Sequence, residues 1–315
     1  MKTLYYILFV IILSSRVFPQ ACCSAGTPIL GSLESSTTPK NNFQLSLTYD
    51  YNILQSVLEG SVRLNDNTRE RITHSALLEL TYGLTDKISL TGLFTYANQR
   101  REVTSAFGSK DLISSFGVGD AVVLIKYELI SQSLLDQNQL ALGVGPKIPF
   151  GKSDKTENGI LLPADIQPGS GSWDFILWGF YSHGFMPAMP LNLFTTISYK
   201  VNTENKRFSN SEAGYKFGNE FVSTLGLGYR TDLFFDGSLS IRFRATSKDE
   251  FDKEEVPNTG GYWIYLIPGL NLKFYNEFTI RIAGQLPVYR FLKGTQLTTT
   301  AALSASFFYN FSLNN

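Results

Sequence analysis

Three charged side chains in the middle of the chain, Asp120, Lys147 and Asp174, are the residues best placed to form a charged site. Each stands at one end of a segment in which apolar and polar residues alternate. If these segments are neighbouring antiparallel strands, the three side chains lie at the same end of the sheet, within reach of one another. We expect an acid–base–acid cluster, because pairing offsets the cost of burying each charge. Such a cluster either fixes the register of the strands or selects what enters.

Further charged side chains project in the same direction from other alternating segments. We expect them to line the same interior: Glu79, Lys126, Glu220, Arg242, Arg244 and Arg281. Together with the first cluster they comprise five basic and four acidic groups. This balance predicts a mixed lumen without a clear ion preference.

The segments that carry these residues show apolar side chains at every second position, which is typical of β-strands. Twelve candidate strands cover about 43–51, 76–82, 88–96, 121–129, 140–148, 173–181, 191–201, 217–229, 239–245, 262–273, 278–290 and 298–311. In the sixth, Ile176, Trp178 and Phe180 make the second face apolar as well, so two orientations are open for that strand.

The connections alternate in length along the chain. Short ones lie near 83–87, 130–138, 184–190, 231–236 and 274–277, and longer polar ones near 52–72, 98–116, 151–171, 203–214, 247–259 and 291–297. An even strand number with alternating short and long connections is typical of bacterial transmembrane barrels. Closure is required, because an open sheet edge in lipid would leave backbone groups unpaired. We therefore predict an all-β fold, a closed antiparallel transmembrane β-barrel of about 12 strands over residues 42–315. A soluble β-sandwich or a periplasmic ligand-binding barrel is the alternative.

Composition agrees with a barrel. The 315 residues include 27 basic and 27 acidic side chains, 17% charged residues, 14% aromatic residues and 43% hydrophobic residues. The mean hydropathy is −0.03. The apolar content excludes a disordered chain, and the zero net charge disfavours a nucleic-acid binder. No 18-residue apolar run follows the N-terminus, so no transmembrane helix is expected.

The N-terminus predicts export. Lys2 precedes the apolar run 4–13, which has the length of a signal-peptide core and is too short to span a bilayer as a helix. We expect residues 1–21 to be cleaved, leaving 22–41 as a flexible segment that acts as a spacer or plugs the lumen. Cys22 and Cys23 could pair with another chain or bind a soft metal such as Cu(I), although two thiols make a weak metal site. No cofactor is expected.

Three motifs resemble one known family. They are GVGD at 117–120 leading to IKY at 125–127, GVGPKIPFG at 143–151, and SGSWD at 170–174. They are similar to the GxGD–strand–KY, K-[LI]-P-x-G and GS-x-D elements of an outer-membrane "transporter" family, labelled putative MetA-pathway of phenol degradation. The chain departs from the pattern at Phe150, where a small hydroxyl residue is commoner, and at its end, Asn314-Asn315, where an aromatic residue is usual. The resemblance implies passage of small hydrophobic or aromatic compounds.

We therefore expect a channel in the bacterial outer membrane that passes small solutes passively. Its partners would be membrane lipid and a small-molecule solute, with no nucleic acid. A structural or adhesive barrel is the second hypothesis, and metal handling through Cys22 and Cys23 is a third. An enzyme is not expected, because His74 and His183 each adjoin a serine in sequence, and adjacent strand residues point to opposite faces.

Overall fold

The computed structural model describes residues 36–105, 107–133, 136–185, 189–208, 213–275 and 278–312. The predicted signal peptide, most of the 22–41 segment, and Cys22 and Cys23 lie outside these residues. In the described part of the chain, no helix is long and apolar enough to cross a membrane.

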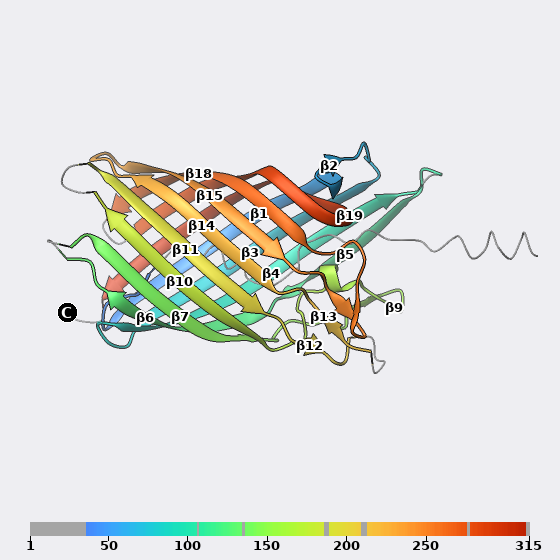
Figure 1. The fold of residues 1–315 in the computed structure, drawn as a ribbon, viewed down its shortest axis with the longest axis horizontal. Coiled ribbons are helices and arrows are strands. Elements are labelled where there is room, and N and C mark those ends of the chain that lie inside the picture. The colour runs from blue at the N-terminus through green and yellow to red at the C-terminus, as the bar shows by residue number, and fades with distance from the viewer. Residues whose placement is uncertain are drawn as a thin grey trace, which may run out of the picture.

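A closed ring of antiparallel strands forms the molecule (Figure 1). The ring consists of β1 (Asn42–Gly60), β3 (Arg69–Gly83), β4 (Ile88–Thr104), β6 (Ala121–Ile130), β7 (Asn138–Ile148), β10 (Asp174–Gly184), β11 (Leu191–Val201), β14 (Glu220–Tyr229), β15 (Phe235–Thr246), β18 (Gly261–Tyr275) and β19 (Phe278–Ser312). Each strand pairs with the next in the chain, so every connection is a hairpin.

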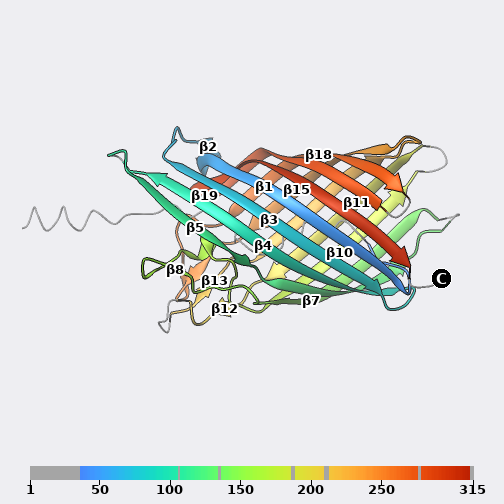
Figure 2. The same cartoon turned by 180° about the vertical axis from the view of Figure 1, so that it is seen from behind.

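The last element closes the barrel. β19 has 35 residues and crosses the wall twice: its first arm, 278–292, pairs with β18, and its second arm, 295–312, pairs with β1. Figure 2 shows β1 and β19 side by side at this seam. The eleven elements therefore give twelve crossing segments, which confirms the predicted all-β, closed antiparallel barrel of about 12 strands.

The two ends of the barrel differ. We call the end with the short connections the turn end; both ends of the ring, at Asn42 and Ser312, lie there. The opposite end, with connections 61–68, 105–109, 149–173, 202–219 and 247–260, is the loop end. It also carries short strands: β2 (Val62–Arg63), β8 (Thr156–Glu157), β9 (Ile160–Leu161), β12 (Glu204–Asn205), β13 (Tyr215–Lys216), β16 (Glu250–Phe251) and β17 (Glu254–Glu255).

Two predicted loops are largely strand, so that part of the sequence interpretation is wrong. The expected loop 98–116 is a hairpin in which the end of β4 pairs with β5 (Lys110–Val118), and most of the expected loop 52–72 belongs to β1 and β3. These extensions carry polar residues on both faces, for example Arg100 next to Arg101, so they lack the apolar alternation that marks the rest of the wall. Side chains add to the backbone pairing: Lys110 pairs with Glu102 across the β4–β5 hairpin, and Leu54 and Val57 pack on Leu297 in the β1 extension.

The outer face is an apolar band. Leu225 on β14 and Ile241 on β15 are each 52% exposed, whereas their inward-facing neighbours Thr224 and Ser240 are buried. The same alternation runs around the ring, with tyrosines such as Tyr127 and Tyr229 near strand ends. An apolar surface that encircles the molecule is far larger than a protein in water exposes. The band therefore contacts lipid, and the chain is a transmembrane barrel.

Candidate functional site in the barrel lumen

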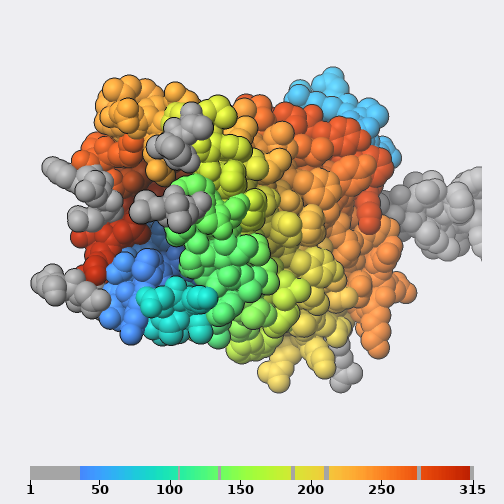
Figure 3. Space-filling model, turned by 60° about the vertical axis from the view of Figure 1, so that its left-hand side comes forward, coloured from blue at the N-terminus to red at the C-terminus, as the bar shows by residue number. Residues whose placement is uncertain are grey.

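A cavity of about 460 Å³ runs inside the barrel along β1, β3, β14, β15, β18 and β19. It extends from Ser46, Phe308 and Asp236 near the turn end to Arg71 and Glu220 near the loop end. Figure 3 looks toward the turn end and shows a hollow between the blue β1 side and the orange-red β18 and β19 side. The lumen is thus open space on this half.

The other half of the lumen is filled with apolar side chains. This apolar cluster consists of Leu77, Leu93, Val122, Leu124, Ala141, Ile176, Trp178 and Phe180, with Phe194 packed against it. The cluster settles the orientation of β10, because Ile176, Trp178 and Phe180 all point inward. Trp178 packs on Gly143, where an added Cβ would lie 3.0 Å from the indole ring. Leu77, Phe180 and Phe194 also border the cavity and give it one apolar wall.

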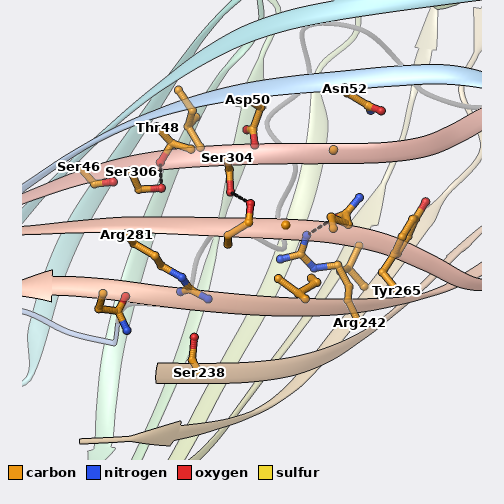
Figure 4. A pocket seen from close by; sticks show the side chains of 18 of the residues that line it. Ser46, Thr48, Asp50, Asn52, Ser238, Arg242, Tyr265, Arg281, Ser304 and Ser306 are labelled. Carbon is orange, nitrogen blue, oxygen red and sulfur yellow. Dashed lines mark hydrogen bonds between the residues drawn. The ribbon is translucent and has the colours of Figure 1, made fainter. Parts of the chain in front are cut away.

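The opposite wall is built by β1, β15, β18 and β19, and it is largely polar, with Tyr265, Ile267 and Ala283 of a second buried apolar cluster among its side chains. Arg242 Nε donates to Thr224 Oγ1 at 3.3 Å, and Arg242 Nη1 donates to Gln285 Oε1 at 2.8 Å. Thr48 Oγ1 donates to Ser306 Oγ at 2.8 Å. Figure 4 shows Arg242 and Arg281 in this wall, with Asp50, Ser304 and Ser306 nearby.

Several carboxylates of the cavity are ion-paired. Glu220 accepts hydrogen bonds from Lys200 Nζ at 3.0 Å and from Arg244 Nε at 2.6 Å. Glu79 lies 3.8 Å from Lys126 Nζ, and Asp236 lies 2.9 Å from Lys273 Nζ. The lining of the cavity includes five residues predicted for the lumen, namely Glu79, Glu220, Arg242, Arg244 and Arg281. Lys126 is fully buried beside it, with its ammonium 4.6 Å from the Trp178 ring centre.

The structure brings Asp120, Lys147 and Asp174 together at the loop ends of β6, β7 and β10. Lys147 Nζ lies 2.8 Å from Asp120 Oδ2 and 2.7 Å from Asp174 Oδ2, and all three side chains are buried. They do not line the cavity. Instead, Asp120 accepts hydrogen bonds from the backbone N–H of Gly151 at 3.2 Å and of Ser170 at 3.0 Å. The three sequence motifs therefore meet in one network, which fastens both ends of the 149–173 loop to the barrel wall.

The loop held by this network folds into the barrel. Its single turn of 3-10 helix, η2 (Ala164–Ile166), is buried. Asp165 Oδ2 lies 3.1 Å from Arg71 Nη1 on β3 and 3.8 Å from Arg101 Nη1 on β4. Gln99 Nε2 also donates to the carbonyl of Ile166 at 3.4 Å. The second half of the expected long polar connection 151–171 is thus folded inward and buried, whereas its first half, which contains the β8–β9 hairpin, is largely exposed.

A second, small cavity shows that η2 reaches the wall formed by β11, β14 and β15, across the lumen from β3 and β4. A cavity of about 30 Å³ is bordered by Asp165 and by Lys200, Glu220 and Arg244 from β11, β14 and β15. Asp249 also borders this space, from the β15–β16 connection. Burial raises the pKa of Asp249, and the nearby Asp165 carboxylate raises it further. The loop therefore spans the lumen between opposite walls and narrows it at the loop end.

Residues 36–41 lie against inward-facing groups at the turn end. Thr37 Oγ1 donates to Glu128 Oε2 at 2.7 Å, and Lys126 Nζ donates to the carbonyl of Ser36 at 3.4 Å. The Asn41 N–H donates to the Gly83 carbonyl at 2.9 Å. This short segment therefore occupies part of the turn end beside the apolar cluster.

The two histidines belong to hydrogen bonds away from the cavity. His74 Nδ1 is 2.7 Å from the Tyr49 hydroxyl, and His183 Nδ1 is 2.9 Å from Asn138 Oδ1. Their sequence neighbours Ser75 and Ser182 face the interior. Within the described ranges, no group of three or more His, Cys, Asp or Glu side chains is arranged to hold a metal.

Sequence reasoning missed several charged residues of the lumen. Arg71, Arg101 and Asp165 fell in segments interpreted as loops, and Asp236 fell in an expected short connection. Lys200 was detectable, because it continues the polar positions 196 and 198 of its strand and pairs in register with Glu220. The inward position of Asp165 had no signal in the sequence.

The comparisons with known proteins agree with this architecture. The family described as "Putative MetA-pathway of phenol degradation" matches residues 56–298. No curated protein matches the sequence. Among solved structures, an outer membrane channel from Pseudomonas putida F1 is 13% identical, with a TM-score of 0.70 over 88% of this chain and 97% of that one. A Pseudomonas aeruginosa FadL homologue is 10% identical, with a TM-score of 0.43 over 95% and 99%. The first of these likenesses shows a shared barrel fold.

Proposed function

Because the chain belongs to the family described as "Putative MetA-pathway of phenol degradation", we propose that it is a passive outer-membrane channel for small solutes with an apolar, aromatic body. The turn end then faces the periplasm and the loop end faces outward. The channel has no catalytic role in this proposal.

One observation carries the proposal: the closed barrel encloses a two-faced cavity. Leu77, Phe180 and Phe194 form an apolar wall, and the opposite wall carries hydroxyl and guanidinium groups beside Tyr265 and Ile267. The volume of about 460 Å³ lies in the range of pockets that hold small molecules. An aromatic solute can bury its ring on the first wall while its polar group stays hydrogen-bonded on the second.

We also propose roles for the two segments that enter the barrel. The 149–173 loop, fastened by Asp120, Lys147 and Asp174, is the fixed constriction at the outer mouth. Residues 36–41 narrow the periplasmic end through the contacts of Ser36 and Thr37 with Lys126 and Glu128. Both constrictions keep the open pathway on the cavity side of the lumen.

Planar-bilayer recording of the full chain tests the channel. We expect discrete ion currents that phenol interrupts at lower concentration than glucose does, because only phenol has an apolar face for Phe180 and Phe194. The double variant Phe180→Ala/Phe194→Ala should weaken the phenol effect. Phe175→Ala is the matched control, since Phe175 lies on the same strand, is 47% exposed and faces lipid. The absence of any current, or equal interruption by phenol and glucose, would overturn the proposal.

A further inference from the structure

The cavity carries more positive than negative charge. Its lining cations are Arg71, Arg230, Arg242, Arg244 and Arg281. Its lining carboxylates are Asp50, Glu79, Glu220 and Asp236. The ion pairs described above add four cations (Arg101, Lys126, Lys200 and Lys273) but only one carboxylate, Asp165. With Asp249 of the adjoining small space included, the network around the cavity holds nine cations against six carboxylates, and the surplus favours an anion inside a confined space.

Arg242 is the best-placed of these cations. Its hydrogen bonds to Thr224 and Gln285 hold the guanidinium in a fixed orientation at the cavity wall. Arg281 lies further toward the turn end of the same wall (Figure 4). A planar guanidinium binds a carboxylate through two parallel hydrogen bonds, which an ammonium cannot do.

An aromatic ring reaches the strand that carries Arg242. The ring of Phe194 covers Gly226, where an added Cβ would lie 2.3 Å from the ring Cζ and 2.6 Å from Ser240 Oγ. Ser240 is the inward-facing residue next to Arg242 on β15, so the two side chains start about 7 Å apart along the strand. Glycine at 226 therefore brings the apolar wall to the edge of the cationic wall.

From this juxtaposition we propose that the cavity contains a subsite for aromatic carboxylates, with the ring against Phe194 and Phe180 and the carboxylate on Arg242. The subsite rests on the proposed channel function and gives it a solute class. The structure supplies both halves of the recognition: an apolar surface within the lumen and a cation that Thr224 and Gln285 orient at its wall.

A substitution at Asp50 should change the affinity for an anionic solute in the opposite direction to a substitution at Arg242. It faces the lumen from β1, close enough to Arg242 to interact with it electrostatically. A solute carboxylate bound to Arg242 would lie near the Asp50 carboxylate, and the two negative charges would repel each other. Removing the Asp50 charge should therefore strengthen binding of an anionic solute, whereas removing the Arg242 charge should weaken it.

Isothermal titration calorimetry on the purified, detergent-solubilised chain measures the subsite without requiring conductance. Benzoate is the probe, and benzyl alcohol is its neutral counterpart of nearly the same shape. We expect Arg242→Gln to weaken benzoate binding about tenfold or more, since a hydrogen bond to a charged group is lost, and to weaken benzyl alcohol binding far less, because Gln still offers a donor to a neutral hydroxyl. Asp50→Asn should tighten benzoate binding. Lys87→Gln is the control, because it removes an exposed charge outside the cavity.

Arg242→Lys keeps the charge without the paired donors and should give an intermediate affinity for benzoate. Heat-modifiable migration on a gel shows whether each variant folds, and Arg242→Lys replaces Arg242→Gln as the test if the latter does not fold. Equal binding of benzoate and benzyl alcohol, or unchanged benzoate binding in the Arg242 variants, would overturn the subsite. Benzoate binding without ion current would overturn the channel alone. Current that benzoate and benzyl alcohol affect equally would leave the channel standing and overturn the subsite.

Discussion

Replacing Lys147 by methionine is the most informative perturbation of the motif network. The substitution keeps a long, flexible side chain but removes the ammonium that lies 2.8 Å from Asp120 and 2.7 Å from Asp174. Both carboxylates remain buried, and they now face each other without a counter-ion. Breaking a buried ion pair by removing one partner costs about 3–5 kcal/mol.

This cost weakens the attachment of the 149–173 loop to the barrel wall. Asp120 holds the loop through the Gly151 and Ser170 backbone groups, so releasing the loop lets water reach the carboxylates and relieves the penalty. A cost of about 3 kcal/mol, the lower figure, raises the population of the released loop about 100-fold. We therefore expect the barrel to stay folded while its outer constriction opens.

Hydrogen exchange of the Gly151 and Ser170 amides in reconstituted protein measures this release, and bilayer conductance measures its effect on the pathway. Lys147→Met should speed exchange of both amides about 100-fold and raise conductance. Lys152→Met is the matched control, because Lys152 lies exposed on the same loop. Native exchange rates and native conductance in Lys147→Met would refute the assignment of this cluster as the fastening of the constriction.

Three further predictions follow from the lumen. Asp165→Asn weakens the pairs to Arg71 and Arg101 and should increase conductance in bilayer recordings, while an unchanged current would show that η2 does not limit flow. Gly226→Ala places a methyl group against the Phe194 ring at a cost of about 1–3 kcal/mol and should weaken interruption by phenol; undiminished interruption would remove Phe194 from the pathway. The raised pKa of Asp249 means that its ionisation destabilises the folded loops. The loops should therefore be best protected from proteolysis at low pH, and this protection should fall as the pH rises above the ordinary carboxyl range. Asp249→Asn should therefore narrow the difference in loop proteolysis between pH 4 and pH 8, and an equal difference in both proteins would contradict this.

The barrel wall was predictable because lipid imposes a strict requirement on every second residue. Leu225 and Ile241 alternate with Thr224 and Ser240, and such alternation can be read without tertiary information. The β4–β5 hairpin escaped prediction because its buried face, which includes Gln99, Arg101 and Ser115, is polar like its exposed face. For β10 the period left two orientations open, since its inward residues Ile176, Trp178 and Phe180 join an apolar cluster inside the lumen.

The clustering of charged residues at the candidate site was partly predictable, because the alternating pattern also reveals the order of the strands. Asp120, Lys147 and Asp174 stand at corresponding ends of adjacent strands, so strand order alone places them together; their role stays a prediction. The contacts of Asp165 are different in kind, because they join a loop to strands about 65 and 95 residues away in sequence. No local pattern encodes such a contact, and the constriction therefore emerges only from the folded chain.

Single-channel recording of the full chain in a planar bilayer tests the central claim most directly, namely that the cavity beside the apolar cluster is a continuous pathway. Stepwise currents should appear in the wild type, grow in Lys147→Met, and be interrupted by aromatic solutes through Phe180 and Phe194. A correctly inserted barrel that carries no current in either protein would show that the lumen is closed, and the proposed channel would then be wrong.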